Sequence, residues 1–497
     1  MSIPVTSSVS RLLTGVLGLD DILLGGLSKR HMYLVEGQPG TGKTTLGMQF
    51  LLAGKSVGER CLYVTLSETK VELREAADSR GWSLDGIEFV EFVPDEAILA
   101  DEQRYTVFHP GDIELASTIK KVIAEIERVA PDRLVIDSLS EFRLLAPEPF
   151  LYRRQLLALK QFFAGRSTTV LLLNDVAPEG DDHQVLSIVH GVISLSKLPR
   201  SYGVTRRRIE ILKMRGADYR AGHHDYKLDA GGLSVYPRLV AAEHGEDFAD
   251  DLLSSNLPAL DALFGGGIER GSSTLVFGPD GVGKSLIAMQ YAYAAATRQE
   301  RAVVYYFDET LRTAKKRASG LGMCVEAEIK ANHLCLEQID AAEISPGEFV
   351  WKIRREVEEK NARVVVIDSL NGYLLSMPGE SDLALHMHEL LEFLNQKGVS
   401  TFLVLGQQNL LGQGSSDINI SYLADNALIM RYFEAGASVR RAISVLKKRS
   451  GTHENTIREL RFGSDGIQLG EPLAEFKGVL SGTPESVEVP QTSIKEL

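Results

Sequence analysis

The fold is decided by residues 32–44, MYLVEGQPGTGKT, where a short apolar run leads directly into a glycine-rich loop. The same order recurs at residues 273–285, STLVFGPDGVGKS. Both loops fit the pattern G-x-x-x-x-G-K-[ST] and lie between a strand-like run and a helix-forming segment, as a phosphate-binding loop requires. Glycines let backbone amides converge on phosphate oxygens, and the following helix adds its positive amino-terminal end. Each loop therefore predicts a nucleotide site.

The loops and two later aspartates define the expected ligands of Mg-ATP. Lysine in this motif reaches the β and γ phosphates, and the hydroxyl that follows it binds Mg²⁺. Asp137 and Asp368 each end an apolar run, where a carboxylate emerges at the ligand-binding edge of an α/β sheet. Each could hold the metal directly or through water, or could simply cap a helix. The metal set is thus Thr44 with Asp137 and Ser285 with Asp368, and the expected ATP-binding residues are Gly37, Gly40, Thr41, Gly42, Lys43, Thr44, Thr45, Gly278, Gly281, Val282, Gly283, Lys284, Ser285 and Leu286.

The chain of 497 residues is one unit written twice. Three further landmarks recur in the same order, and the matching stretches are 61–69 with 303–310, 133–139 with 364–370, and 212–216 with 446–450. Four matched landmarks in one order indicate a tandem duplication of a domain of about 230 to 240 residues. We expect a first domain at 1–242, a linker at 243–250, a second domain at 251–479 and a mobile tail at 480–497.

The apolar pattern predicts an α/β fold. Short apolar runs at 62–66, 134–136 and 170–173 alternate with longer helical patterns at 113–129 and 150–163. Buried strands that alternate with helices are typical of a mostly parallel sheet with helices on both faces.

Hydrolysis needs a group that orients or deprotonates the attacking water. Glu68 and Glu309 each end the strand that comes after the loop helix, which places them near the γ phosphate, although both could be plain surface carboxylates. Asp308 precedes Glu309, whereas Ser67 takes that position in the first copy, so the two halves are chemically unequal.

Polar residues also end a later strand in each copy. Asn174 in the first copy, and Gln407 with Gln408 in the second, could sense the γ phosphate or be ordinary turn residues.

Two cation pairs, Lys213 with Arg215 and Lys447 with Arg449, are spaced i, i+2 on strand-like segments. This spacing sends both side chains to one face of a strand. They could neutralise phosphate charge on ATP held by a neighbouring subunit, or form a solvated face.

Composition narrows the functional classes. A net charge of −13 argues against a protein whose whole surface coats nucleic acid, although a local basic channel could coexist with that charge. The three cysteines are scattered, which indicates neither a disulfide framework nor a zinc cluster. Without a leader peptide or an apolar run that could span a bilayer, we expect a cytoplasmic protein with no membrane partner.

Taken together, these residues resemble the KaiC family of RecA-like ATPases over about residues 11–486. The most specific elements are the doubled Leu-Asp-x-Leu-hydrophobic-Gly-Gly segment, the strands that lead into Ser-Glu-Thr or Asp-Glu-Thr, the Lys-x-Arg strands, and the closing stretch 478–484. The resemblance implies two RecA-like domains, a homo-hexamer with ATP between subunits, and partners such as KaiB-like or other signalling proteins. It also implies slow ATP hydrolysis in the first domain and serine autokinase activity in the second.

The resemblance also assigns an acceptor segment at 417–425. Ser421 falls on the family's phosphoacceptor serine, and Tyr422 replaces the usual threonine, so Ser421 or Tyr422 would accept phosphate. Aspartate at Asp308 is one methylene shorter than the family's glutamate, and Ser450-Gly451 inverts the usual Gly-Ser after Lys-x-Arg.

Three functions therefore stay open from sequence. The leading one is an ATPase and serine autokinase that acts as a signalling or timing ring. The others are a nucleotide-switched signalling scaffold without kinase activity, and a RecA-like DNA-processing motor. The acidic balance and the lack of a zinc ribbon count against the motor.

Overall fold

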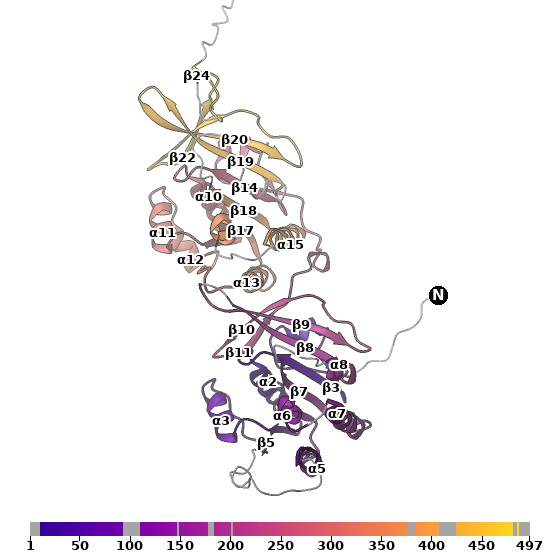
Figure 1. Cartoon of the computed structure of the whole chain (residues 1–497). Coiled ribbons are helices and arrows are strands. Elements are labelled where there is room, and N and C mark those ends of the chain that lie inside the picture. The colour runs from indigo at the N-terminus through magenta and orange to yellow at the C-terminus, as the bar shows by residue number, and fades with distance from the viewer. Residues whose placement is uncertain are drawn as a thin grey trace, which may run out of the picture. The chain divides into compact units, whose positions relative to one another are not determined.

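The computed structural model describes residues 10–92, 110–146, 149–176, 183–199, 202–375, 383–406, 424–480 and 485–486. The chain forms two compact units, Met1–Arg238 and Leu239–Leu497, which are described separately below as the first and second unit. Each has a central sheet with helices on both faces (Figure 1). Among the described residues, no helix combines the length and the apolar character needed to cross a bilayer.

The first unit contains a nine-stranded sheet in the order β11-β10-β9-β8-β3-β7-β6-β4-β5. The six strands from β8 to β5 are parallel, and β9, β10 and β11 continue the sheet in antiparallel fashion. The sheet strands are β3 Met32–Gly37, β4 Cys61–Thr65, β5 Ile87–Glu91, β6 Arg133–Asp137, β7 Thr169–Asp175, β8 Gly191–Leu198, β9 Arg206–Met214, β10 His224–Asp229 and β11 Gly232–Tyr236. A separate small pair joins β1 Arg11–Leu12 to β2 Leu27–Ser28.

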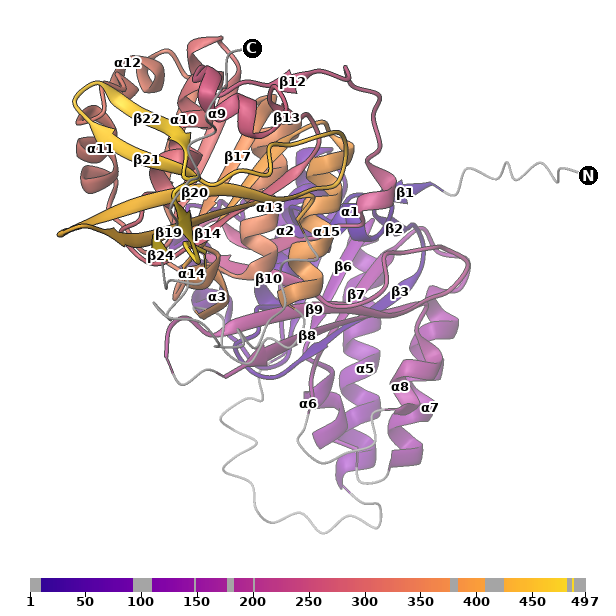
Figure 2. The ribbon, with the colours of Figure 1, turned by 90° about the horizontal axis from the view of Figure 1, so that it is seen from above.

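Helices cover both faces of this sheet because successive strand residues point to opposite sides. Tyr33 and Val35 pack in one apolar cluster with α2 and α3, whereas Leu34 packs in another with α5 and α7. Figure 2 shows α5, α6, α7 and α8 gathered on one side. The helices are α1 Leu19–Ile22, α2 Lys43–Ser56, α3 Lys70–Asp78, α5 Pro110–Val129, α6 Leu139–Leu144, α7 Pro149–Phe163 and α8 His183–Ile188.

The second unit repeats this topology, with the order β16-β15-β17-β18-β14-β19-β20-β21-β22. Its sheet strands are β14 Ser273–Gly278, β15 Arg301–Tyr306, β16 Leu334–Gln338, β17 Ala362–Asp368, β18 Ser400–Gly406, β19 Asn426–Ala435, β20 Ser438–Lys448, β21 Arg458–Gly463 and β22 Gly466–Pro472. Its helices are η1 Ala241–Glu243, α9 Pro258–Leu263, α10 Lys284–Thr297, α11 Leu311–Ser319, α12 Val325–Lys330, α13 Pro346–Glu358, α14 Leu370–Leu375 and α15 Leu383–Gln396. The small strands β12 Leu252–Leu253 and β13 Ile268–Glu269 pair with each other.

The predicted α/β fold is therefore confirmed in both halves. The apolar runs at 62–66, 134–136 and 170–173 lie within two residues of β4, β6 and β7, because continuous apolar runs mark strands that are buried on both faces. The expected helices at 113–129 and 150–163 correspond to α5 and α7.

The segment between the repeats packs on the second unit. The backbone amide of Ala241 donates to Glu389 of α15, and the His244 ring lies edge-on to Phe393 at 5.2 Å between ring centroids. Lys397 pairs with Glu246. Part of the predicted linker at 243–250 is thus attached to α15. In the predicted tail, β24 Glu485–Ser486 pairs with β23 Phe476–Lys477.

Candidate active sites

The first phosphate loop follows β3 and ends at the start of α2. Lys43 is buried, and its Nζ donates to the carbonyls of Gly37 at 2.9 Å and Gln38 at 3.1 Å. It also pairs with Asp175 at 2.6 Å, where Asp175 ends the neighbouring strand β7. Gly42 has φ 99°, a left-handed backbone that glycine adopts without strain and that lets the loop turn into the helix.

A hydroxyl and a carboxylate meet beside this loop. Thr44 Oγ1 donates to Asp137 Oδ2 at 2.8 Å, and the Tyr63 hydroxyl donates to the same oxygen at 2.5 Å. Asp137 is the last residue of β6, and its burial raises the pKa of the carboxyl. A buried carboxylate of this kind favours a nearby cation, so Thr44 and Asp137 fit the Mg²⁺ that accompanies ATP. Among the described residues no cluster of three His, Cys, Asp or Glu could hold a metal alone.

Glu68 lies in the turn between β4 and α3. The strand ends at Thr65, so the expectation that Glu68 ends the strand was wrong by three residues. The turn is fixed because Thr65 Oγ1 donates to the Glu68 carbonyl at 2.6 Å, and Thr69 with Glu72 forms a capping box at the start of α3. Burial raises the pKa of the Glu68 carboxyl, and the nearby Asp137 charge adds to that rise.

The second phosphate loop has the same backbone but different charges around its lysine. Lys284 Nζ donates to the carbonyls of Gly278 at 2.9 Å and Pro279 at 2.8 Å, and its ion partner at 3.3 Å is Asp280 within the loop itself. A cavity of about 450 Å³ opens beside the loop. It brings together most of the residues predicted for this site, namely Gly281, Gly283, Lys284, Ser285, Leu286, Asp308, Glu309 and Asp368.

The metal pair of the second site parallels the first. Asp368 ends β17 and hydrogen-bonds Ser285. Burial raises the pKa of the Asp368 carboxyl to about 6, and the Ser285 bond only partly offsets that rise. Ser285 and Asp368 therefore fit Mg²⁺ for the same reason as Thr44 and Asp137.

The two acids of the second site have separate partners. Asp308 is exposed and accepts a short hydrogen bond from the Ser369 hydroxyl. Glu309 pairs with Arg317 of α11, with oxygen-to-nitrogen distances of 2.9 and 2.8 Å. Both acids lie in the turn after β15, which ends at Tyr306. Glu309 was predicted to end this strand and, like Glu68, lies three residues beyond its observed end.

The cation pair of the first unit binds carbonyls of that same unit. Lys213 Nζ donates to the carbonyls of Leu186 and Val189, and Arg215 donates to that of Ser187 at 2.7 Å. Burial lowers the pKa of Lys213, and Arg215 lowers it further.

In the second unit, Lys447 donates to the Ala424 carbonyl at 2.6 Å, and Arg449 pairs with Asp425 at 2.9 Å. Arg215 and Arg449 both remain exposed.

The remaining predicted residues differ in how far the structure describes them. Asn174, predicted to end a strand, is the last but one residue of β7, and it is buried. Gln407, Gln408, Ser421 and Tyr422 lie outside the described residues.

Sequence reasoning missed several side chains that surround the loops. Asp175, Lys197 and Arg317 approach from other elements, and Lys197 donates to the Pro39 carbonyl of the first loop at 2.6 Å. The available signal was the strand order, because the carboxyl ends of strands beside β3 must converge on its loop.

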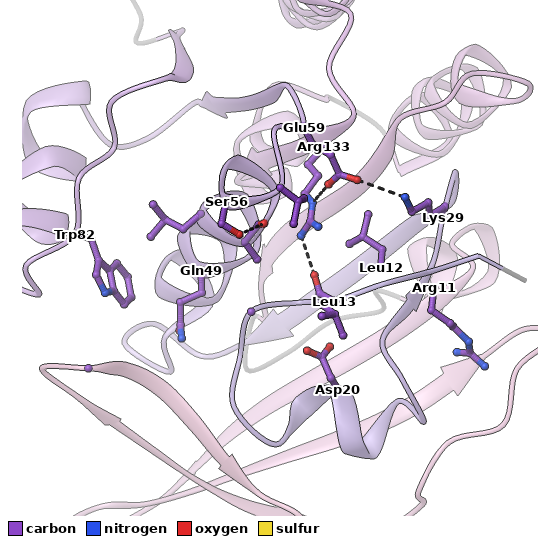
Figure 3. A pocket seen from close by; sticks show the side chains of 15 residues that line it. Arg11, Leu12, Leu13, Asp20, Lys29, Gln49, Ser56, Glu59, Trp82 and Arg133 are labelled. Atoms are coloured by element: carbon purple, nitrogen blue, oxygen red, sulfur yellow. Dashed lines mark hydrogen bonds and ion pairs between the residues drawn. The ribbon is translucent and has the colours of Figure 1, made fainter.

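A larger cavity of the first unit, about 940 Å³, lies away from the phosphate loop against α2 (Figure 3). The buried Arg133 side chain donates to Glu59 at 2.6 Å and to the Leu13 and Phe50 carbonyls at 2.8 Å each. Lys29 shares Glu59 at 3.4 Å. The Arg133 charge is neutralised within the protein, so these contacts indicate a structural role.

Comparison with known proteins gives the family. The model of the KaiC ATPase family matches residues 12–240 and 253–474, which together make up most of the chain. This chain belongs to the KaiC ATPase family.

The similarity to relatives covers nearly the full length of this chain and of each relative. The circadian clock oscillator protein KaiC of Parasynechococcus marenigrum is 26% identical and covers 98% of this chain and 95% of its own. The circadian clock protein KaiC3 of Synechocystis sp. is 26% identical, covering 96% of this chain and 95% of its own. KaiC of Thermostichus vulcanus is 27% identical, with 97% and 93% covered. This KaiC-family chain thus has two tandem ATPase repeats.

Proposed function

We propose that each unit of this KaiC-family protein binds Mg-ATP and hydrolyses it. The observation that carries the proposal is the recurrence, beside both loops, of a buried lysine among loop carbonyls and a hydroxyl bonded to a strand-end carboxylate. When bound, Mg-ATP supplies the transferable phosphoryl group and the divalent charge. Thr44 with Asp137, and Ser285 with Asp368, would hold the metal.

Glu68 is the group that would orient water in the first unit. The pKa of its carboxyl is raised, which brings that pKa closer to neutral pH. A general base works best when its pKa lies near the operating pH. Glu309 would take that role in the second unit, where Arg317 holds its carboxylate.

Alanine variants of the two lysines test the binding sites. Lys43→Ala should abolish nucleotide binding in the first unit and Lys284→Ala in the second, because each removes a buried charge aimed at the phosphates. Equilibrium binding of a fluorescent ATP analogue should give two sites for the parent, one for each single variant and none for the double variant. Binding of the double variant at the parent level would refute the assignment.

Turnover separates the ATPase from a nucleotide-switched scaffold. Release of inorganic phosphate from the parent under single-turnover conditions, lost in the double lysine variant, supports hydrolysis. Tight binding without product formation would favour the scaffold.

We propose in addition that the second unit transfers phosphate to Ser421. The specific support is that Asp308 already accepts a hydrogen bond from the hydroxyl of Ser369 in this site, so it can accept one from an alcohol. In the transfer, Ser421 Oγ would form the new bond to the γ phosphorus, ADP would leave, and the hydroxyl proton would pass to Asp308.

Phosphopeptide mapping after incubation with Mg-ATP tests this transfer. Phosphate on Ser421 should disappear in Asp308→Asn and Lys284→Ala and persist in Lys43→Ala. An unmodified chain would leave only the ATPase, and phosphate on Tyr422 would move the acceptor by one residue.

We propose a homo-hexamer in which Lys213, Arg215, Lys447 and Arg449 approach nucleotide held by a neighbouring subunit. Arg215 and Arg449 are exposed, as such a contact requires. Analytical ultracentrifugation with saturating Mg-ATP should give a hexamer, and a monomer would refute the assembly.

A further inference from the structure

A second cavity of the first unit, about 360 Å³, lies at the opposite end of β3 from the phosphate loop. It lies where β3 and β8 begin, because Tyr33 pairs with Gly191 in the parallel register. The residues just before these strands, His31 and His190, therefore become neighbours. The cavity is lined by Arg30, His31, Lys160, His190 and Arg215, with Phe163 and Ile188 among its apolar walls.

The two histidines stack face to face. Their ring centroids are 3.7 Å apart with 4° between the planes, and the Tyr33 ring lies edge-on to His190. Burial, followed by the charges of His31, Arg215 and Lys213, lowers the pKa of His190 to about 4. Burial also lowers the pKa of His31. The pair is thus neutral at pH 7 and surrounded by positive charge.

The described residues that line this cavity include no carboxylate. Arg30, Lys160 and Arg215 form no ion pair with any described residue. The Arg215 guanidinium donates to the Ser187 carbonyl at 2.7 Å, and its backbone amide donates to the His190 carbonyl at 3.0 Å. Three cations and two imidazoles therefore line a space to which the described part of the chain contributes no carboxylate.

The second unit has an aspartate at the position that corresponds to His190. Asp425 precedes β19 as His190 precedes β8. Its carboxylate accepts from the Ser273 amide and hydroxyl, each at 2.9 Å, and pairs with Arg449 at 2.9 Å. Arg449 is the repeat partner of Arg215. The second unit thus supplies a carboxylate, Asp425, to its arginine. The first unit has His190 at that position, with a cavity beside it.

We propose that this cavity of the first unit, which we call the histidine cavity, binds a phosphate-type dianion through Arg30, Lys160, Arg215 and the His31–His190 pair. The anion takes the position that the Asp425 carboxylate has in the second unit. Arginine binds phosphate oxygens in bidentate fashion, and a lysine adds a point charge. Each imidazole can donate one further hydrogen bond.

Two sources could supply this group. One is free inorganic phosphate. The other is the terminal phosphate of a nucleotide held by another copy of the chain, and this source alone rests on the assembly proposed above.

Chemical modification of histidine gives a readout specific to the cavity. The nucleotide-free full-length protein is treated with diethyl pyrocarbonate in a phosphate-free buffer, with and without inorganic phosphate, and modified histidines are mapped by mass spectrometry. At phosphate about four times its dissociation constant, modification of His31 should slow about fivefold, because only the unbound fraction reacts. His223 and His388, exposed elsewhere, should react at unchanged rates.

Three variants sharpen the test. His190→Asp installs the carboxylate of the second unit and should abolish protection of His31, and Lys160→Ala should weaken it. Lys352→Ala, which removes a lysine paired with Glu337 in the second unit, should leave protection unchanged. Thermal melting checks that each variant is folded. Protection of His31 in the parent chain tests the proposal without any variant.

A second arm with Mg-ATP distinguishes the sources. Protection by inorganic phosphate alone identifies a free anion. Protection by Mg-ATP alone, lost in the double variant Lys43→Ala/Lys284→Ala, identifies nucleotide on another copy. Unchanged His31 reactivity in both arms would overturn the proposal even if both phosphate loops bind ATP, and so would full protection in His190→Asp.

Discussion

The two phosphate sites share a backbone and differ in the side chains that reach them. In the first unit Lys43 pairs with Asp175 from the next strand, and Lys197 covers the loop. In the second unit Lys284 pairs with Asp280 inside the loop. Glu309 is held by Arg317, whereas Ala76 occupies the matching position of α3 and Glu68 has no such arginine. A duplicated fold has thus kept its nucleotide cradle while the groups that act on the γ phosphate diverged.

The largest expected difference between the two sites is the effect of replacing their glutamates on the rate of hydrolysis. Glu68→Gln in a Lys284→Ala background should slow phosphate release by about a hundredfold or more, the range for loss of a general base. Glu309→Gln in a Lys43→Ala background should have a smaller effect, because Arg317 already restrains that carboxylate. Single-turnover phosphate release measures both, and equal losses would show that the two sites work alike.

The next effect concerns the last glycine of each loop. A Cβ at Gly283 would lie 2.3 Å from a Phe462 ring carbon, whereas one at Gly42 would meet Leu228 at 3.4 Å. Both have left-handed backbones, so Gly283→Ala should cost about 1 to 3 kcal/mol more than Gly42→Ala through overpacking. Thermal melting of the full chain compares them. Phe462→Leu should recover part of the loss, and no recovery would place the cost elsewhere.

A smaller effect is expected from Arg317→Ala. Removing a partly buried ion pair worth about 0.5 to 1 kcal/mol should free Glu309 and speed hydrolysis in the second unit about two- to fivefold. The assay uses the Lys43→Ala background, and Arg317→Lys, which keeps the charge, serves as control. A slower rate in Arg317→Ala would show that this arginine aids the reaction instead.

The smallest expected effect is a difference in acid stability. Because the folded-state pKa of His190 is about 4, below its ordinary value near 6.5, its contribution to stability is present above pH 6.5 and is lost as pH falls toward 4. Arg30, His31, Lys160, Lys213 and Arg215 oppose the added proton. Melting curves between pH 7.5 and 4.5 should slope less steeply for His190→Asn, and inorganic phosphate should reduce the slope of the parent. Identical slopes would contradict this prediction.

The sequence predicted the parts of the site that one segment carries and missed those that sheet assembly brings together. Each loop is complete within eight residues, and Asp137 and Asp368 end apolar runs that are visible by eye, so their placement followed from pattern alone. Asp175 is 132 positions from Lys43 and reaches it only because β7 pairs with β3.

Two other features of the sites were missed for different reasons. Arg317 is only eight residues beyond Glu309, but the turn that brings them together has no pattern of its own. The sequence already showed that the two halves differ at Ser67 and Asp308. The first half also has His190 where the second has Asp425, and this difference could be interpreted only once the cavity beside His190 was seen.

The packing of the segment between the repeats determines where a fragment that carries only the second repeat should begin. Leu239 and Ala241 belong to the apolar core that contains α15, and His244 covers Phe393. A shortened reading frame that starts at 251 would strip this cover and expose the α15 face to water, whereas one that starts at 239 would keep it. Cloning the second repeat alone, or grafting it behind another protein, should therefore retain these twelve codons for soluble expression.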